Sequence, residues 1–320
     1  MTRSRLSTTD DGTGKATRRS FLAGLGSLGF VAIGTVAGRT SAATDSRSAD
    51  TQPGEDPFTN SDELETFVDN VMAERLGTTT PGATVAIVSG DSPILTKGYG
   101  AADVDADVPV RADETVFRVG SVGKLVTYTA VMQGVEQGVL DLDTDIKSYL
   151  GDSAVTVPAT YDDPVTLRHL GTHTAGFEST LDPDIVADPA ALDSLEALLT
   201  DRQPSRIRPP GELVGYSNYG AALAGHVIAE AHGTTFEEYV QSELFEPLDM
   251  THSTFAQPVS DDQPGDLAAP HVRDGESFLV ADDVYINMRP AGSLSATLTD
   301  MAAFMRAHLG DGAVGDTRIL

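Results

Sequence analysis

The stretch Val119-Gly120-Ser121-Val122-Gly123-Lys124-Leu125 opens an apolar, helix-like segment of the chain. It places a serine and a lysine three residues apart, and positions i and i+3 share one face of a helix. The Ser121 hydroxyl is therefore expected within hydrogen-bond reach of the Lys124 amine. A serine beside an unprotonated amine is an activated nucleophile, which predicts acyl transfer with Ser121 as nucleophile and Lys124 as general base. The alternative is a chance Ser-x-x-Lys on an exposed helix.

The scarcity of lysine weighs against that alternative. The only lysines of the chain are Lys15, Lys97, Lys124 and Lys147, and 48 acidic against 21 basic residues give a formal net charge of −27. Dense carboxylates keep a surface hydrated and mutually repelling, which is most useful where concentrated salt screens them. We interpret the composition as halophilic, the alternative being a moderately acidic protein from low salt. The negative electrostatic potential of such a surface disfavours nucleic acid as a partner.

Length and cysteine content limit the number of domains and the kinds of chemistry that are possible. The 320 residues are enough for one large domain or two small ones. The chain contains no cysteine, which excludes disulfides, thiolate metal sites and a cysteine nucleophile. His169 and His173 are spaced i, i+4 with Glu178 nearby, but a zinc motif needs a third clear ligand. We expect neither a metal nor a cofactor.

The N-terminal region is typical of an export signal. The run Thr17-Arg18-Arg19-Ser20-Phe21-Leu22 resembles a twin-arginine motif, and an uncharged stretch and then small residues follow up to Ala43. This predicts a signal peptide over residues 1–43 and an extracellular or cell-surface protein with no stable membrane insertion after cleavage. An uncleaved anchor is the alternative. Residues 44–58 are polar with Pro and Gly, which predicts a disordered linker.

Apolar periodicity predicts the elements of the folded part, residues 59–320. One amphipathic helix has its apolar face at Leu64, Phe67, Val68, Val71 and Met72. The runs 83–89 and 94–100 predict a hairpin. Further helices are expected around residues 192–199, 223–231, 236–244 and 301–308, the last capped by Thr299-Asp300, whereas 256–283 is expected to be irregular. No convincing strand follows residue 300, although a lone hairpin is marginally stable.

A second candidate for catalysis is Tyr216-Ser217-Asn218, on a turn before a helix. Tyr216 is placed to shuttle the Ser121 proton to the leaving group. Asn218 is placed to hydrogen-bond Lys124 and the substrate carbonyl. The alternative is a packed loop tyrosine and an asparagine that stabilises the turn. Tyr285-Ile286-Asn287 repeats the pattern, but no helix starts at the right offset after it, so we favour Tyr216.

Together these residues resemble the serine β-lactamase and penicillin-binding-protein-like family, in the branch of class C β-lactamases, D,D-carboxypeptidases and related esterases. The motifs, in family order, are Phe117-Arg118-Val119-Gly120, Ser121-x-x-Lys124, 170–176 (LGTHTAG), Pro210-Gly211, Tyr216-Ser217-Asn218, 247–250 (PLDM) and Pro290-Ala291-Gly292. The resemblance implies an α+β fold, with an antiparallel sheet flanked by helices beside an all-helical domain. It implies a cleft between them that holds Ser121, Lys124, Tyr216 and Asn218.

The chain departs from the family at the third motif, Lys-Thr-Gly or His-x-Gly on a strand after the last helix. His308-Leu309-Gly310 matches by letter but falls at the end of a predicted helix. By resemblance the C-terminal strands are missing, so residues 59–320 are expected to be a partial, C-terminally truncated domain. Hydrolase activity is therefore predicted for the complete domain.

Two functions remain open at this point. The first is an exported serine hydrolase that forms an acyl-enzyme on Ser121 and hydrolyses an ester, amide or β-lactam of a small molecule or peptide. The second is a catalytically inactive surface or binding protein, or an inactive fragment, that keeps the fold. Retention of all four candidate residues favours the enzyme, because a binding protein does not need them together.

Overall fold

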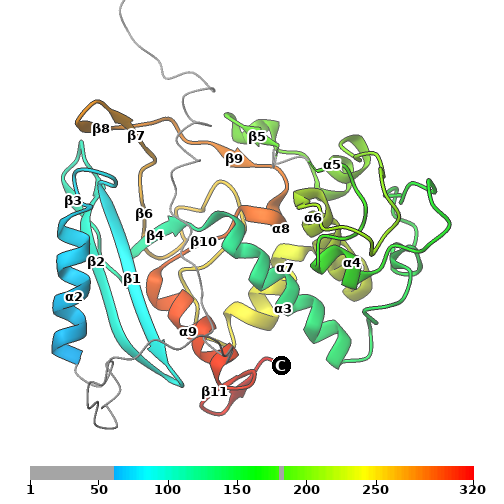
Figure 1. The fold of residues 1–320 in the computed structure, drawn as a ribbon, viewed down its shortest axis with the longest axis horizontal. Helices are drawn as coiled ribbons and strands as arrows, with labels where there is room; N and C mark the ends of the chain where they lie inside the picture. Colours follow the sequence, from blue (N-terminus) through cyan, green and yellow to red (C-terminus); the bar gives the residue numbers. More distant parts are fainter. Residues whose placement is uncertain (1–60, 180–183) are drawn as a thin grey trace, which may run out of the picture.

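The chain is described by a computed structural model that covers residues 61–179 and 184–320. The predicted signal peptide (1–43) and linker (44–58) lie outside the described residues. One side of the described part is a sheet covered by helices, and the other side is mainly helical (Figure 1). Among the described residues, no helix has both the length and the apolar character that a membrane span requires.

The first sheet is antiparallel with the order β1-β2-β3. Its strands are β1 (Gly82–Ser89), β2 (Ser92–Asp103) and β3 (Val108–Pro109). The predicted hairpin is confirmed, with Gly82 paired to Gly100 and Ser89 to Ser92. Within the described chain, no strand pairs with the other edge of β1.

Helix α2 (Ser61–Ala73) packs on this sheet through Leu64, Val68 and Met72. Phe67, which the sequence placed on the same apolar face, is 65% exposed. The buried residues form a narrow stripe at positions i, i+4 and i+8, and Val71 beside it is exposed as well. The predicted face was therefore too wide.

Helix α9 (Leu298–Leu309) packs against β1 and β2. Its N-cap is Thr297, whose side chain accepts a hydrogen bond from the Asp300 backbone N–H, and not the predicted Thr299-Asp300. Asp300 is buried instead and accepts hydrogen bonds from the Ser253 hydroxyl and the His252 backbone. His308-Leu309-Gly310 ends this helix, with Gly310 as its C-cap.

The helical part is built around two helices that contact one another, α3 (Gly123–Glu136) and α6 (Asn218–His232). Helix α6 is buried from Asn218 to Ala229, and Gly233 ends it in the left-handed conformation, which glycine adopts without strain. The other helices are α4 (Leu167–Gly171), α5 (Leu195–Asp201), α7 (Phe236–Val240), α8 (Arg289–Gly292), the 3₁₀ turns η1 (Gly120–Val122), η2 (Ile146–Tyr149) and η3 (Pro189–Ala191), and the π turn η4 (Gln241–Phe245).

Short strands tie these parts together. The second sheet has the order β10-β4-β6 and leads the chain into η1. The remaining strands are β4 (Thr115–Arg118), β5 (Ile185–Val186), β6 (Asp266–Leu267), β7 (His271–Asp274), β8 (Ser277–Val280), β9 (Tyr285–Ile286), β10 (Ser295–Ala296), β11 (Ala313–Val314) and β12 (Thr317–Arg318).

Two expectations about strands were wrong. The hairpin β7–β8 lies inside residues 256–283, which the sequence marked as irregular. A two-residue pair, β11–β12, also follows α9. Both hairpins turn through glycines with positive φ, Gly275 and Gly315, and strands of two to four residues are too short to show a period of two.

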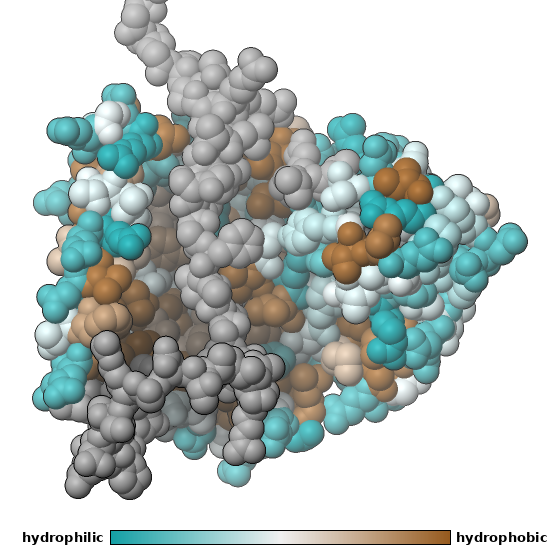
Figure 2. All heavy atoms as spheres, viewed as in Figure 1, coloured by the Kyte–Doolittle hydropathy of each residue, from teal (hydrophilic) through white to brown (hydrophobic). Residues whose placement is uncertain are grey.

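The main hydrophobic core fills the helical part and includes Val126 and Ala130 of α3 and Leu223 and Val227 of α6. On the face shown in Figure 2, hydrophilic side chains cover α2 and the outer side of the helical part. Hydrophobic residues gather between these two regions in the same view. The core therefore fixes α3 and α6 against one another, and their N-terminal ends carry the candidate site.

Candidate active site

Strand β4 delivers the chain to the turn that holds Ser121. The Val119 N–H donates to the Leu294 carbonyl, and Gly120 has φ +57° with no atom within 4 Å of where a Cβ would be. That conformation strains any residue other than glycine. Ser121 lies in η1, directly before α3, and Lys124 lies in the first turn of α3. The sequence placed both on one helix, whereas the structure divides them between a 3₁₀ turn and the helix that continues it.

The structure brings the four predicted residues together. Lys124 Nζ lies 3.0 Å from Ser121 Oγ and 2.8 Å from Asn218 Oδ1. The Tyr216 hydroxyl lies 2.8 Å from Ser121 Oγ, and either oxygen can be the donor. Ser121 Oγ thus has the lysine amine and the tyrosine hydroxyl as its two neighbours, and the polar contacts needed for proton movement are present.

Burial sets the protonation of Lys124. The residue is 6% exposed, and desolvation lowers the pKa of its amine to about 7, far below the usual value of about 10.4. Among the described residues its hydrogen-bond partners are a hydroxyl, an amide oxygen and a backbone carbonyl, without a carboxylate. With no negative charge in contact to favour the ammonium, a large fraction of Lys124 is neutral near pH 7.

A helix cap positions Tyr216 and Asn218. Ser217 is the N-cap of α6, and its Oγ accepts a hydrogen bond from the Gly220 N–H at 2.9 Å. Asn218 is consequently the first residue of α6, buried at 5% exposure, with its amide oxygen on Lys124. The Tyr216 carbonyl accepts a hydrogen bond from Ser179 Oγ at 2.5 Å. The cap therefore places both side chains beside Ser121.

The 170–176 segment supplies a neighbour whose role the sequence did not specify. The ring centroids of His173 and Tyr216 lie 4.6 Å apart. Burial, with a contribution from Lys124, lowers the pKa of His173, and its Nδ1 accepts a hydrogen bond from the Ser217 N–H at 3.3 Å. His173 thus fixes the tyrosine ring from the side, in a loop that bends through its own positive φ of 57°.

The sequence also missed the carbonyl of Ala291. Lys124 Nζ donates to it at 2.5 Å, and Thr127 Oγ1 donates to the neighbouring Pro290 carbonyl at 2.7 Å. Helix α8 is thereby bound to α3 at two adjacent positions. The only signal in the sequence was the Pro290-Ala291-Gly292 motif of the resemblance, because a backbone acceptor leaves no trace in residue type.

The competing candidates have other contacts. The Asn287 side chain accepts from the Asp193 N–H and donates to the carboxylates of Asp184 and Asp193, so it joins loops near α5. His169 Nδ1 hydrogen-bonds Thr166 at the start of α4. In the part of the chain that the structure describes, no three His, Asp or Glu side chains form a group that could hold a metal.

Comparison with known proteins bears on this geometry. The sequence model of the family described as Beta-lactamase matches residues 67–320. The chain belongs to the β-lactamase family. Its α+β architecture is the β-lactamase and transpeptidase-like fold, and the family is one of hydrolases that act on small-molecule or peptide substrates.

Two relatives and one solved structure illustrate the likeness. The chain is 31% identical to penicillin-binding protein 4 of Amycolatopsis lactamdurans, over 75% of this chain and 62% of the relative. It is 29% identical to a β-lactamase of Yersinia enterocolitica, over 77% and 60% respectively. The octameric penicillin-binding protein homologue from Pyrococcus abyssi superposes with a TM-score of 0.67 at 26% identity, over 79% of this chain and 57% of that one. The chain thus spans about three fifths of the length of these relatives.

Proposed function

We propose that this protein is an exported serine hydrolase that forms an acyl-enzyme on Ser121. The observation that carries the proposal is the buried Lys124 amine, with a pKa of about 7, lying 3.0 Å from Ser121 Oγ. An uncharged amine can accept the serine proton, whereas an ammonium cannot. The substrate class is an ester, an amide or a β-lactam, because each presents a carbonyl carbon to the same nucleophile.

The residues divide the reaction as follows. Ser121 Oγ attacks the substrate carbonyl carbon, its proton passes to Lys124 Nζ, and the carbonyl electron pair moves to the oxygen. The tetrahedral intermediate then collapses, and the leaving group takes the proton through the Tyr216 hydroxyl, which lies 2.8 Å from Ser121 Oγ. Water next attacks the acyl ester, returns a proton to Ser121 by the same groups and releases the acid.

Hydrogen bonds keep the amine in place during these steps. Asn218 Oδ1 and the Ala291 carbonyl accept from Lys124, which leaves its lone pair to be directed at the serine when the amine is neutral. The Ser121 N–H, at the leading end of α3, is proposed as one donor to the oxyanion. The helix dipole there favours negative charge and disfavours the ammonium.

Export is proposed from the sequence alone, on the twin-arginine run around Arg18-Arg19 and the small residues up to Ala43. The halophilic character is likewise a proposal from the net charge of −27. The two fit one another, because the twin-arginine route carries folded proteins and an acidic protein is expected to fold in concentrated salt.

Covalent labelling tests the proposal. Purified protein in molar KCl is treated with a fluorescent penicillin and, separately, with a fluorophosphonate probe, and intact mass is recorded. We expect one adduct per chain, lost in Ser121→Ala and retained in Ser92→Ala, an exposed serine at the start of β2. A folded wild-type protein that takes up neither probe contradicts the hydrolase and favours the binding protein. Turnover of p-nitrophenyl esters, a chromogenic cephalosporin and D-amino-acid peptides then ranks the substrates.

A further inference from the structure

His173 contacts the residues on both sides of Tyr216, which is proposed as the proton shuttle. The His173 carbonyl accepts a hydrogen bond from the Gly215 N–H at 2.7 Å, and its Nδ1 accepts one from the Ser217 N–H at 3.3 Å. The imidazole also packs on the Tyr216 ring, with centroids 4.6 Å apart and an interplanar angle of 40°. One residue therefore holds the backbone before Tyr216, the backbone after it and the aromatic ring itself.

The backbone of His173 adopts an uncommon conformation in order to make these contacts. Its φ of 57° lies in the left-handed region, which few residues other than glycine occupy. Such a conformation persists only where the surrounding structure fixes it, and it is often found at functional sites. The three contacts with residues 215–217 are what fix it here, so the placement of this side chain is itself a candidate for a functional role.

The hydrogen bond from Ser217 selects one protonation state of His173. A ring nitrogen that accepts from a backbone N–H carries no proton, so the proton of the neutral imidazole is on Nε2, whereas an imidazolium has no acceptor at all. Burial, with a contribution from the charge of Lys124, lowers the pKa of His173, which favours the neutral form. The geometry and the electrostatics therefore agree on the tautomer with its proton on Nε2.

The position of Tyr216 bears directly on the proposed reaction. Its hydroxyl lies 2.8 Å from Ser121 Oγ, and Lys124 Nζ lies 5.0 Å from the centre of its ring. Proton transfer needs the two heavy atoms to lie about 2.6–3.2 Å apart, and a misplacement of about 1 Å can cost roughly a hundredfold in rate. A residue that sets the position of Tyr216 therefore affects catalysis without touching the substrate.

We propose that His173, with its proton on Nε2, is a positioning residue that holds the Tyr216 hydroxyl at Ser121 for proton transfer. The inference rests on the proposed function, because it requires that Tyr216 moves the serine proton. His173 itself transfers no proton in this scheme. The hydrogen bond from Ser217 to Nδ1 is the contact that can be tested, since a change of side chain leaves the His173 carbonyl in place.

Steady-state hydrolysis of a p-nitrophenyl ester by two variants of the full chain tests the proposal. His173→Phe keeps a ring beside Tyr216 and removes the Nδ1 acceptor. His173→Asn supplies a side-chain oxygen as a new acceptor, and asparagine adopts positive φ more readily than most residues. We expect kcat to fall by about 10–100-fold in His173→Phe with KM nearly unchanged, and to stay within about threefold of the wild type in His173→Asn. Wild-type kcat in His173→Phe would overturn the proposal.

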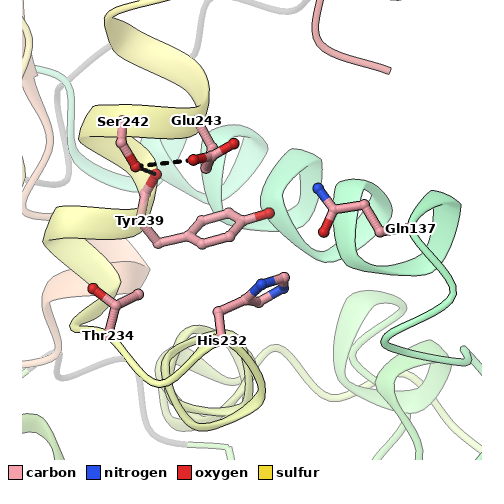
Figure 3. Close-up of a pocket in the computed structure, with 6 residues that line it drawn as sticks. All are labelled: Gln137, His232, Thr234, Tyr239, Ser242 and Glu243. Carbon is pink, nitrogen blue, oxygen red and sulfur yellow. Dashed lines mark hydrogen bonds between the residues drawn. The ribbon is translucent and has the colours of Figure 1, made fainter.

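A second histidine–tyrosine pair provides the matched control. The ring centroids of His232 and Tyr239 lie 4.5 Å apart with an interplanar angle of 47° (Figure 3). His232 is the last residue of α6 and Asn218 is the first, and a helix rises 1.5 Å per residue, so the two lie about 20 Å apart. His232→Phe therefore makes the same change beside another tyrosine and is expected to keep wild-type kcat. Equal losses in His232→Phe and His173→Phe would contradict a specific role for His173.

A double-variant cycle separates positioning from a general structural role. If His173 acts through Tyr216, His173→Phe is expected to cost little further kcat in a Tyr216→Phe background, because the hydroxyl that it positions is already absent. Losses that multiply would show that His173 acts in some other way. Circular dichroism checks that each variant is folded.

Two measurements on the wild type complete the test. The ¹⁵N chemical shifts of the His173 ring are expected to show a proton on Nε2 alone at about pH 8, and a proton on Nδ1 would overturn the proposal even if His173→Phe fails to fold. Fluorophosphonate labelling of Ser121 tests the proposed function separately. Labelling with unchanged kcat in His173→Phe defeats only the role of His173, whereas no labelling defeats the hydrolase and the positioning role together.

Discussion

At the scale of single residues, the buried amine of Lys124 controls the pH dependence of the proposed reaction. Burial lowers its pKa to about 7, so the ammonium predominates below that pH and the neutral base above it. We therefore expect kcat/KM for an ester substrate to fall about tenfold per unit of pH below 7 and to level off above about 8.

The measurement is a pH–rate profile between about pH 5 and pH 9, with Lys124→Arg as the matched variant. Arginine stays protonated throughout this range, so Lys124→Arg is expected to be inactive at every pH. A wild-type rate that stays flat as the pH falls from about 8 to 5 contradicts the assignment of Lys124 as the base.

The second prediction concerns the loss of the Tyr216 hydroxyl. Tyr216→Phe removes the oxygen that lies 2.8 Å from Ser121 Oγ and keeps the ring that packs on His173. We expect kcat to fall by about 10²–10⁴, the usual contribution of a positioned proton carrier, with little change in KM or in the unfolding midpoint. Steady-state kinetics check this, and Tyr285→Phe, in the competing motif, is expected to keep wild-type kcat. Equal losses in the two variants would rule out the shuttle.

At the scale of elements, the close contact of α6 with α8 holds the lysine acceptor in place. A Cβ on Gly225 would lie 2.5 Å from Pro290 Cγ and 2.6 Å from Pro290 Cβ. Gly225→Ala is therefore expected to push α8 away, to weaken the Ala291 carbonyl contact with Lys124 and to destabilise the fold by about 1–3 kcal/mol.

Urea unfolding and the rate of covalent labelling measure these two effects. Gly171→Ala is the matched control, because the nearest atom to its Cβ would be Tyr128 Cε1 at 3.5 Å, an ordinary contact. Wild-type stability and labelling in Gly225→Ala would mean that α8 adapts without cost and does not fix the lysine.

The elements that the sequence predicted well are those whose signal is local. The predicted helix at 223–231 lies within α6 (Asn218–His232): its glycine end was read from the sequence, whereas its first turn, which Ser217 caps, was not included. The predicted helix at 192–199 begins only at Leu195, since Ser194 caps it and Leu192 precedes the cap. The β7–β8 hairpin was missed because its strands have only four residues each and do not alternate between polar and apolar residues in the way that marks a half-buried strand.

At the scale of the whole molecule, the site depends on contacts that sequence spacing cannot reveal. The Ser121–Lys124 pair was predictable because three residues along a helix bring two side chains together. The contact of Lys124 with Ala291 spans 167 positions, and the packing of His173 on Tyr216 depends on how two loops fold. Motif order in the family pointed to these segments, but only the folded chain shows which atoms meet.

The net charge of the molecule predicts how its thermal stability depends on salt. A formal charge of −27 destabilises the compact state through self-repulsion. Salt removes that repulsion, since the Debye length falls from about 10 Å at 0.1 M to about 3 Å at 1 M. We therefore expect the thermal unfolding midpoint, followed by circular dichroism, to rise by roughly 5–10 °C between 0.1 M and 2 M KCl, equivalent to a few kcal/mol for a domain of this size. A midpoint that stays constant or falls with KCl would show that repulsion among the carboxylates does not limit stability, and the halophilic interpretation would be wrong.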